Sequence, residues 1–335
     1  MKAVKRFQAI FLSVLLVLGT VTPVLAAQQE DIGKILTETA AYLMETAPAP
    51  QVGSVGGEWV ILGLARSGCA VPQEYYDSYY SEVEDTLKNA NGVLSTRKYT
   101  EYSRVITAVS ALGKDARNIG GYDLTLPLGD YEKTVRQGTN GAVWALIALD
   151  TRGYPVPKNA AASVQATRQM YVDDLLNAQH ADGGWGISAN TASDADMTAM
   201  VLQALAKYRE QQKVSDTIDR ALAFLKAAPR TSCESTAQMI VALCELGQPV
   251  SDVLVAELLS YRAGAGFCHE SGGAVNQMAS EQAFYALAAL GRSENGQSSL
   301  YTMDALAEKT EYLSVRELIA RAIRLWTSRT GGKSK

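Results

Sequence analysis

The sequence contains few of the residues that usually carry metal and acid–base chemistry. Only two histidines, His180 and His269, occur in 335 residues, and the four cysteines form no Cys-x-x-Cys pair. Structural zinc sites normally take four cysteine or histidine ligands at close spacing. We therefore expect no bound metal and no dedicated cofactor. Two histidines also do not allow a serine–histidine–aspartate triad to be assembled from the sequence.

An excess of basic charge is also lacking. Lysine and arginine number 31 against 35 acidic residues, for a formal net charge of −4, and no basic patch stands out. This balance gives no reason to expect a nucleic-acid partner. The glycine-rich stretch from Gly264 to Gly273 follows no strand pattern and contains no lysine. It therefore does not predict a phosphate-binding loop.

A long apolar run is found only at the beginning of the chain. The basic residues Lys2, Lys5 and Arg6 precede an apolar stretch from Ile10 to Leu18, and Val24-Leu25-Ala26 offers a small-residue cleavage site. This pattern predicts a secretory signal peptide over residues 1–26, and the alternative is an uncleaved anchor helix. We expect a secreted or cell-surface protein with no transmembrane helix after cleavage.

Six apolar segments align without gaps and recur at intervals typical of repeat architectures. Each carries a small residue followed by an apolar one, such as Ala148-Leu149, and five of the six stop on a glycine at one register. A glycine there permits the positive φ of a helix C-terminal cap. We expect six buried helices, at Gly56 to Gly68, Glu101 to Gly113, Gly141 to Gly153, Asp196 to Tyr208, Ser235 to Gly247 and Ala279 to Gly291.

More polar, amphipathic segments alternate with these six. Between Asp216 and Ala228, for example, Ile218, Leu222 and Leu225 share one face of a helix. Such helices bury one face and leave the other in water. The predicted outer helices are Asp31 to Thr46, Gln73 to Ala90, Asn159 to Gln179, Asp216 to Ala228 and Ser251 to Arg262, with a weak, partly irregular element near Leu124 to Val135 and a final helix over Ser314 to Trp326.

Alternation of apolar and amphipathic helices, with almost no strand signal, predicts an all-α fold. We expect an (α/α)6 barrel, or toroid, of six inner and about six outer helices over residues 28–328, followed by a disordered tail at 329–335. In a closed ring each inner helix is shielded by two neighbours and by an outer helix. The alternative is an open solenoid of helix pairs, whose end repeats would need polar caps.

One turn and the helix after it resemble a known superfamily. The turn Gln179-x-x-Asp182-Gly183-Gly184-Trp185-Gly186 resembles the glutamine/tryptophan repeat of terpene cyclases and of protein prenyltransferase β-subunits, and Gly264-x-Gly266-Phe267 looks like a degenerate copy. Asp194-Ala195-Asp196-Met197-Thr198-Ala199 is similar to the DxDDTA motif of squalene–hopene cyclases. The GGEW, WALIALD and DMTAM segments are similar to those of secreted bacterial toroid proteins. The resemblance implies a toroid fold, which is shared with transcobalamin-type carriers.

The resemblance also implies roles for particular residues. Asp196 matches the general acid that protonates an alkene in class II cyclases, and Asp194 would be its neighbouring carboxylate. Met197 replaces the last acid of that motif. The alternative is structural, because Ser193-x-x-Asp196 is a capping-box pattern. In the superfamily the turn's tryptophan, here Trp185, ties neighbouring repeats together.

If all six inner helices run in the same direction, their N-termini meet at one mouth. Aromatic, amide and charged side chains at the mouth of a helical barrel are typical of a small-molecule pocket. The Gly264 to Gly273 loop, with His269 and Glu270, could form a lid. The predicted ligand-binding residues are Glu58, Trp59, Arg104, Asn140, Trp144, Gln238, Glu281, Gln282 and Tyr285.

Three functions follow as hypotheses. The first is an exported protein that binds a small or extended ligand at this mouth, such as an isoprenoid, a glycan or a corrinoid. A corrinoid would require a separate cell-surface β-domain protein to complete its site. The second is an enzyme, either terpene cyclase-like with Asp196 or a polysaccharide lyase or hydrolase. The third is a structural surface module. Export also permits a Cys233–Cys268 disulfide, which spacing alone cannot establish.

Overall fold

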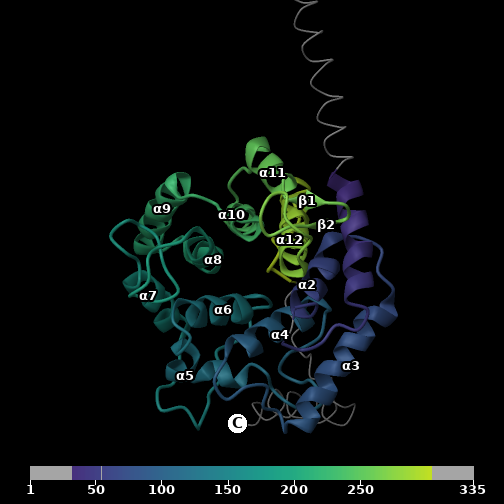
Figure 1. Ribbon diagram of the computed structural model, residues 1–335. Helices are drawn as coiled ribbons and strands as arrows, with labels where there is room; N and C mark the ends of the chain where they lie inside the picture. The colour runs from purple at the N-terminus through teal and green to yellow at the C-terminus, as the bar shows by residue number, and fades with distance from the viewer. Residues whose placement is uncertain (1–31, 54, 304–335) are drawn as a thin grey trace, which may run out of the picture. The chain divides into compact units, whose positions relative to one another are not determined.

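The computed structural model describes residues 32–53 and 55–303 of the chain (Figure 1). The predicted signal peptide (1–26), final helix (314–326) and tail (329–335) lie outside these residues. The predicted helical domain, 28–328, is therefore described over all but its two ends and residue 54.

Helices make up nearly all the regular structure of the described residues, which confirms the prediction of an all-α protein. The six apolar segments are helical, and α6 shows why, since every residue from 141 to 149 is buried. A helix that is apolar on all sides must be covered on all sides. The six are α2 (Glu58–Ser67), α4 (Thr100–Ala111), α6 (Thr139–Asp150), α8 (Ala195–Leu205), α10 (Cys233–Glu245) and α12 (Gln277–Glu294).

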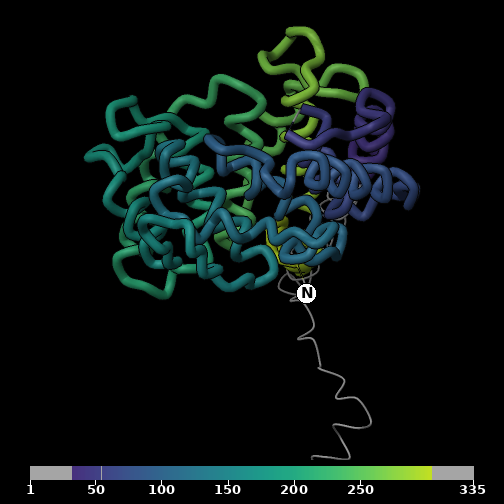
Figure 2. The backbone as a smooth tube through the Cα atoms, turned by 90° about the horizontal axis from the view of Figure 1, so that it is seen from below, coloured from purple at the N-terminus to yellow at the C-terminus, as the bar shows by residue number. Residues whose placement is uncertain are grey.

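These six helices pack in chain order, and the last returns to the first (Figures 1 and 2). α2 packs on α4, α4 on α6, α6 on α8, α8 on α10 and α10 on α12, while α12 packs back on α2. Close approach at this last contact depends on Gly63 of α2, where an added Cβ would lie 2.8 Å from the Phe284 ring. Each of the six helices therefore has two neighbours from the same set.

Glycines end four of the predicted helices as expected. Gly68, Gly113, Gly153 and Gly247 all have positive φ and follow α2, α4, α6 and α10. Gly291 was expected to do the same and does not. It lies inside α12, which continues to Glu294, and Asn295 is the C-cap. The backbone amide and the side-chain amide of Asn295 both donate to the carbonyl of Gly291, at 3.1 and 2.7 Å, which places the cap beyond the glycine.

The amphipathic segments form helices that pack against the six. A helix over residues 32–46 comes first. In α9 the buried side chains include Ile218 and Leu225, whereas Asp219 is exposed. α7, α9 and α11 pack on α6, α8 and α10 respectively. The other elements are α3 (Gln73–Asn89), the 3-10 turn η1 (Leu126–Gly129), α5 (Tyr131–Val135), α7 (Arg168–Asn177), a short 3-10 turn η2 (Ala206–Tyr208), α9 (Gln212–Ala227) and α11 (Asp252–Leu259).

The helix predicted from Asn159 to Gln179 is shorter than expected. It begins only at Arg168, because Thr167 is its N-cap and accepts a hydrogen bond from the amide of Met170 at 3.2 Å. Upstream, the side chain of Asn159 accepts from the amide of Ala161 and stabilises a turn instead. The neighbouring element near Leu124 to Val135 is irregular, as predicted, with η1 and a five-residue α5.

The one two-stranded ribbon of the described residues leads into the predicted lid loop, Gly264 to Gly273, and takes up Arg262, which was predicted to end a helix that in fact stops at Leu259. β1 (Arg262–Ala263) pairs antiparallel with β2 (Gly266–Phe267), and β2 packs on α12. All four cysteines are free, including Cys233 and Cys268, so the disulfide alternative is not formed in this structure. Across the described part of the chain, no helix has both the length and the apolar character that crossing a membrane requires.

Candidate functional site

The glycine/tryptophan turn fixes the approach to α8. Trp185 is fully buried, and its indole Nε1 donates to the carbonyl of Leu175 in α7 at 2.8 Å. Gln179 donates to the carbonyls of Gly183 and Thr217, at 2.8 and 3.0 Å. Because Thr217 belongs to α9, these bonds join α7, the turn and α9. The structural role expected for Trp185 is confirmed.

The start of α8 differs from the predicted capping box. The N-cap is Asp194, whose carboxylate accepts from the amide of Met197 at 2.7 Å. Ser193 faces the other way and donates to Asp182 at 2.8 Å. Its hydroxyl also pairs with His180 Nδ1 at 2.9 Å. The capping box does not form because the Ser193 hydroxyl, which would have to cap α8, is hydrogen-bonded to Asp182 and His180 of the preceding turn.

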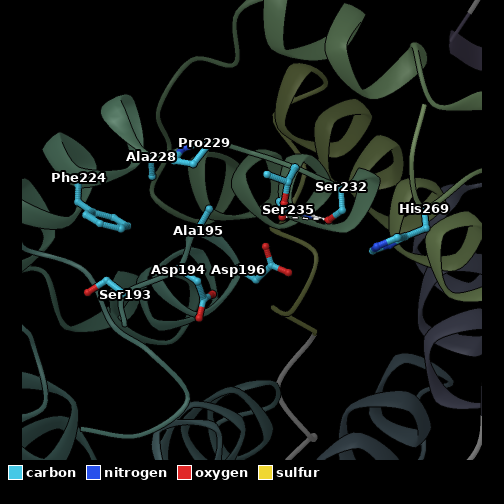
Figure 3. Close-up of a pocket in the computed structure, with 11 residues that line it drawn as sticks. Ser193, Asp194, Ala195, Asp196, Phe224, Ala228, Pro229, Ser232, Ser235 and His269 are labelled. Carbon is cyan, nitrogen blue, oxygen red and sulfur yellow. Dashed lines mark hydrogen bonds between the residues drawn. The ribbon is translucent and has the colours of Figure 1, made fainter. Parts of the chain in front are cut away.

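A cleft of about 490 Å³ lies between the start of α8 and the start of α10 (Figure 3). Asp194 and Asp196 line one side and Ser232 and Ser235 lie across from Asp196, while Phe224 and His269 stand at opposite ends. Its volume is within the range of small-molecule sites. The full lining is Ser193, Asp194, Ala195, Asp196, Phe224, Ala228, Pro229, Thr231, Ser232, Ser235 and His269.

The carboxyl groups around this cleft differ in their electrostatics. Partial removal from water raises the pKa of Asp194, and the neighbouring Asp196 charge adds to that rise. Hydrogen bonding to the amide of Gly184, and to Ser193, lowers the pKa of Asp182. Asp194 is exposed and Asp196 is half-buried. A general acid for alkene protonation needs a dry setting, which this open cleft does not offer.

A histidine–carboxylate pair stands at one end of the cleft. His269 Nδ1 lies 2.8 Å from Oε2 of Glu234, and Glu234 is only 7% exposed in the first turn of α10. The backbone is fixed as well, since the amide of Cys233 donates to the carbonyl of His269 at 3.0 Å. This pair joins residues 35 positions apart. Sequence reasoning placed His269 in a loop without giving it a partner.

Several predicted mouth residues form a buried amide network. Gln238 of α10 donates to Gln282 of α12 at 2.9 Å and also to the hydroxyl of Tyr285. Gln203 of α8 donates to the Gln238 side chain at 2.8 Å, and Tyr301 donates to Gln203. The network therefore ties α8, α10 and α12 together. Gln203 and Tyr301 were not predicted, because Gln203 lies late in its helix and Tyr301 outside the repeats.

The predicted aromatic residues pack on one another. The ring centroids of Trp59 and Trp144 are 4.8 Å apart, and those of Trp59 and Tyr285 are 6.2 Å apart. Trp144 is 6% exposed and Tyr285 is 1% exposed. These side chains come from α2, α6 and α12 and fill space that would otherwise receive a ligand. Tight aromatic packing of this kind indicates a structural role.

Two buried glutamates lie at the beginnings of α2 and α12. Glu58 Oε1 accepts from the amide of Gly53 and Glu281 Oε1 from the amide of Gly56, both at 2.7 Å. Burial raises the pKa of Glu58 and raises that of Glu281 to about 7. The attraction of Arg104 opposes the rise at Glu58. Four buried atoms of the predicted site residues have no hydrogen-bond partner: Glu58 Oε2, Glu281 Oε2, Arg104 Nε and Asn140 Oδ1.

The structure thus divides the predicted site residues among three places. Asp194 and Asp196 line the cleft, and Glu58 and Glu281 are buried, with Arg104 attracting Glu58. The other six are aromatic or amide residues: Trp144, Gln238 and Tyr285 are buried, whereas Trp59, Asn140 and Gln282 are half-buried. The cleft also contains residues that sequence reasoning missed, namely Phe224 and Pro229 near the end of α9. Within the described residues, no group of three histidine, cysteine, aspartate or glutamate side chains could hold a metal ion.

Comparison with known proteins adds no relative. A scan against protein-family models finds no match to this chain, and a search of the curated proteins finds no similar sequence.

Proposed function

We propose that this chain is an exported α/α toroid that binds a hydroxyl-rich organic ligand, such as a glycan, in the cleft between the starts of α8 and α10. The cleft is the observation that carries the proposal. It combines carboxylates, hydroxyls, an imidazole and an aromatic ring around about 490 Å³. This mixture is typical of sites that orient a polar ligand by a few well-placed groups.

The cycle of contacts among α2, α4, α6, α8, α10 and α12 supports the toroid. In an open solenoid the first and last of these helices would have one neighbour each. Here α12 packs on both α10 and α2. Outer helices α7, α9 and α11 each pack on one member of the cycle, as alternation of inner and outer helices requires.

The lining of the cleft favours a ligand with many hydroxyl groups. Asp194 and Asp196 are acceptors for hydroxyl donors, and charge-assisted bonds of this kind are the stronger ones. Phe224 at the other end offers an apolar face on which a sugar ring could stack. An isoprenoid hydrocarbon has no hydrogen-bond donors to pair with the two carboxylates. A corrinoid would require a second chain, such as a cell-surface β-domain protein, to cover it.

A terpene cyclase-like activity is the second candidate. The exposure of the cleft supports it less well than it supports ligand binding. Its general acid, Asp196, would have to remain protonated, yet it is half-buried in an open cleft beside an exposed Asp194. Cyclisation assays with squalene would test this directly, because Asp196→Asn would abolish the activity of a true cyclase.

Titration calorimetry against a panel of neutral and acetylated oligosaccharides tests the proposal. We expect binding that weakens about tenfold in Phe224→Ala and in Asp196→Asn, since each removes roughly 1.4 kcal/mol of contact energy. Asp219→Asn is the matched control, because Asp219 lies on the exposed face of α9. Absence of binding to every member of the panel, or equal binding in all variants, would overturn the proposed ligand class.

A further inference from the structure

His269 is held in an orientation that leaves one ring nitrogen for chemistry. Its Nδ1 lies 2.8 Å from the Glu234 carboxylate, which accepts the Nδ1 proton. In the neutral ring the other nitrogen, Nε2, then carries a lone pair. The imidazole points into the cleft (Figure 3), and the His269 side chain is 56% exposed. Nε2 is therefore both basic and accessible to a ligand.

The partner carboxylate is well placed to keep that orientation. The Glu234 side chain is 10% exposed, and it stands in the first turn of α10, where the helix dipole favours its charge. The His269 carbonyl accepts the amide of Cys233, so the backbone is fixed on the same helix turn. A buried carboxylate behind a histidine fixes the tautomer and the orientation of the ring.

Three further acidic residues line the cleft or follow His269 in the chain. Asp194 and Asp196 reach the cleft from α8, and Glu270 follows His269 in its own loop. Ser232 and Ser235, 3.0 Å apart, line the cleft at the start of α10. The partial positive charge of that helix end favours an oxyanion.

We propose that the cleft is hydrolytic, with His269 as general base and Glu234 as its positioning residue, and that it removes acyl groups from an O-acylated, hydroxyl-rich ligand. This rests on the proposed ligand class. Hydrolysis of a glycosidic bond is the weaker fit, because it needs two carboxyl groups on opposite sides of the bond. Asp194 and Asp196 lie two residues apart at one helix start.

The reaction is balanced with water as the only co-reactant. His269 Nε2 removes a proton from water, and the oxygen attacks the ester carbonyl to give a tetrahedral oxyanion. When the carbonyl re-forms, the ester C–O bond breaks, and the imidazolium returns its proton to the departing alkoxide. The products are a carboxylic acid and the free hydroxyl of the ligand. One histidine serves as base and then as acid, as in other acyl-transfer enzymes.

Hydrolysis of 4-nitrophenyl acetate and of an acetylated oligosaccharide by the full chain tests the proposal. We expect His269→Asn to lower kcat/KM at least 100-fold, in the range typical for loss of a general base. Asp219→Asn is the control, because Asp219 lies on the exposed face of α9 and does not line the cleft. It should keep the wild-type rate. A rate in His269→Asn equal to that of Asp219→Asn would overturn the proposal.

Glu234→Gln separates a positioning role from a structural one. The amide still accepts the Nδ1 proton but carries no charge to stabilise the imidazolium formed in the transition state, so kcat should fall about tenfold while KM stays unchanged. An unchanged kcat, or a change confined to KM, would contradict the role of Glu234. Binding of the deacetylated oligosaccharide is measured in parallel. Binding without hydrolysis would contradict the catalytic inference alone. Absence of both binding and hydrolysis would contradict the proposed ligand class.

Discussion

Glu58 and Glu281, on two different helices, hold the same loop. Oε1 of each accepts a backbone amide at 2.7 Å, from Gly53 and Gly56 respectively. The second oxygen of each carboxyl group is buried without a hydrogen-bond partner. Burial of the Glu281 carboxyl group, with a smaller contribution from the charge of Glu58, disfavours its ionised form, so the pKa of Glu281 rises to about 7. This contact links the start of α2 to α12.

The stability of the fold should therefore depend on pH through Glu281. Its pKa in the folded state lies above the ordinary value of 4.5. The group therefore stabilises the fold fully below pH 4.5, and that contribution is lost as the pH rises through about 7. Glu281→Gln should remove up to about 3 kcal/mol of this pH dependence in the free energy of unfolding. Urea denaturation at a series of pH values measures it.

Glu74→Gln is the control for that experiment, because Glu74 is an exposed residue in the first turn of α3. It should leave the pH dependence of unfolding unchanged. Equal pH dependence in the wild type and Glu281→Gln would show that Glu281 ionises normally.

Closure of the helix cycle can be tested with two helical glycines. An added Cβ at Gly63 would lie 2.8 Å from the Phe284 ring, whereas nothing lies within 4 Å of one at Gly291. Gly63→Ala should destabilise the protein by about 1–3 kcal/mol through overpacking between α2 and α12. Gly291→Ala should stabilise it by roughly 0.5–1 kcal/mol through helix propensity. Thermal melting distinguishes them, and a neutral Gly63→Ala would contradict the α2–α12 contact.

Replacement of Trp185 by phenylalanine should weaken the junction of α7 with the turn. The change removes the donor to the Leu175 carbonyl and leaves part of a fully buried side chain unfilled. We expect a loss of about 1–3 kcal/mol in the free energy of unfolding. Chemical denaturation measures it. A loss below about 0.5 kcal/mol would mean that the indole does not stabilise the junction.

The cap at α8 predicts a difference between two substitutions of Asp194. Asparagine keeps an oxygen that can accept the Met197 amide, whereas alanine does not. Asp194→Ala should cost about 1 kcal/mol of stability, and Asp194→Asn only a few tenths. Thermal unfolding of both variants checks this. Equal losses would show that the charge of Asp194, and not its hydrogen bond, stabilises the helix.

Much of the fold could be predicted from local pattern. The six apolar helices lie within a few residues of their predicted positions, because an apolar helix such as α6 and a stop glycine such as Gly113 are both signals within one segment. Outer helices were located less well where side-chain capping decided the boundary, as Thr167 does for α7. Gly291 shows the limit of the glycine signal, because its helix continues past it.

The candidate site was predicted less well. Sequence reasoning selected residues at the starts of the apolar helices, and Asp194 and Asp196 do line the cleft. It assigned Trp144 and Tyr285 to a ligand pocket, whereas both pack in the interior, as the alternative of a structural module would have them. It also could not foresee Phe224, which comes from an outer helix whose polar pattern carries no sign of a site.

The sequence by itself determined the helical class, the alternation of apolar and amphipathic segments and most helix ends, since these depend on side-chain periodicity and backbone preference over a few residues. Only the tertiary structure decided which helix ends meet. In the folded chain His269 hydrogen-bonds to Glu234, Ser193 donates to Asp182 and does not cap α8, and α12 packs on α2. Such pairings depend on packing between residues far apart in the chain, and no local pattern encodes them.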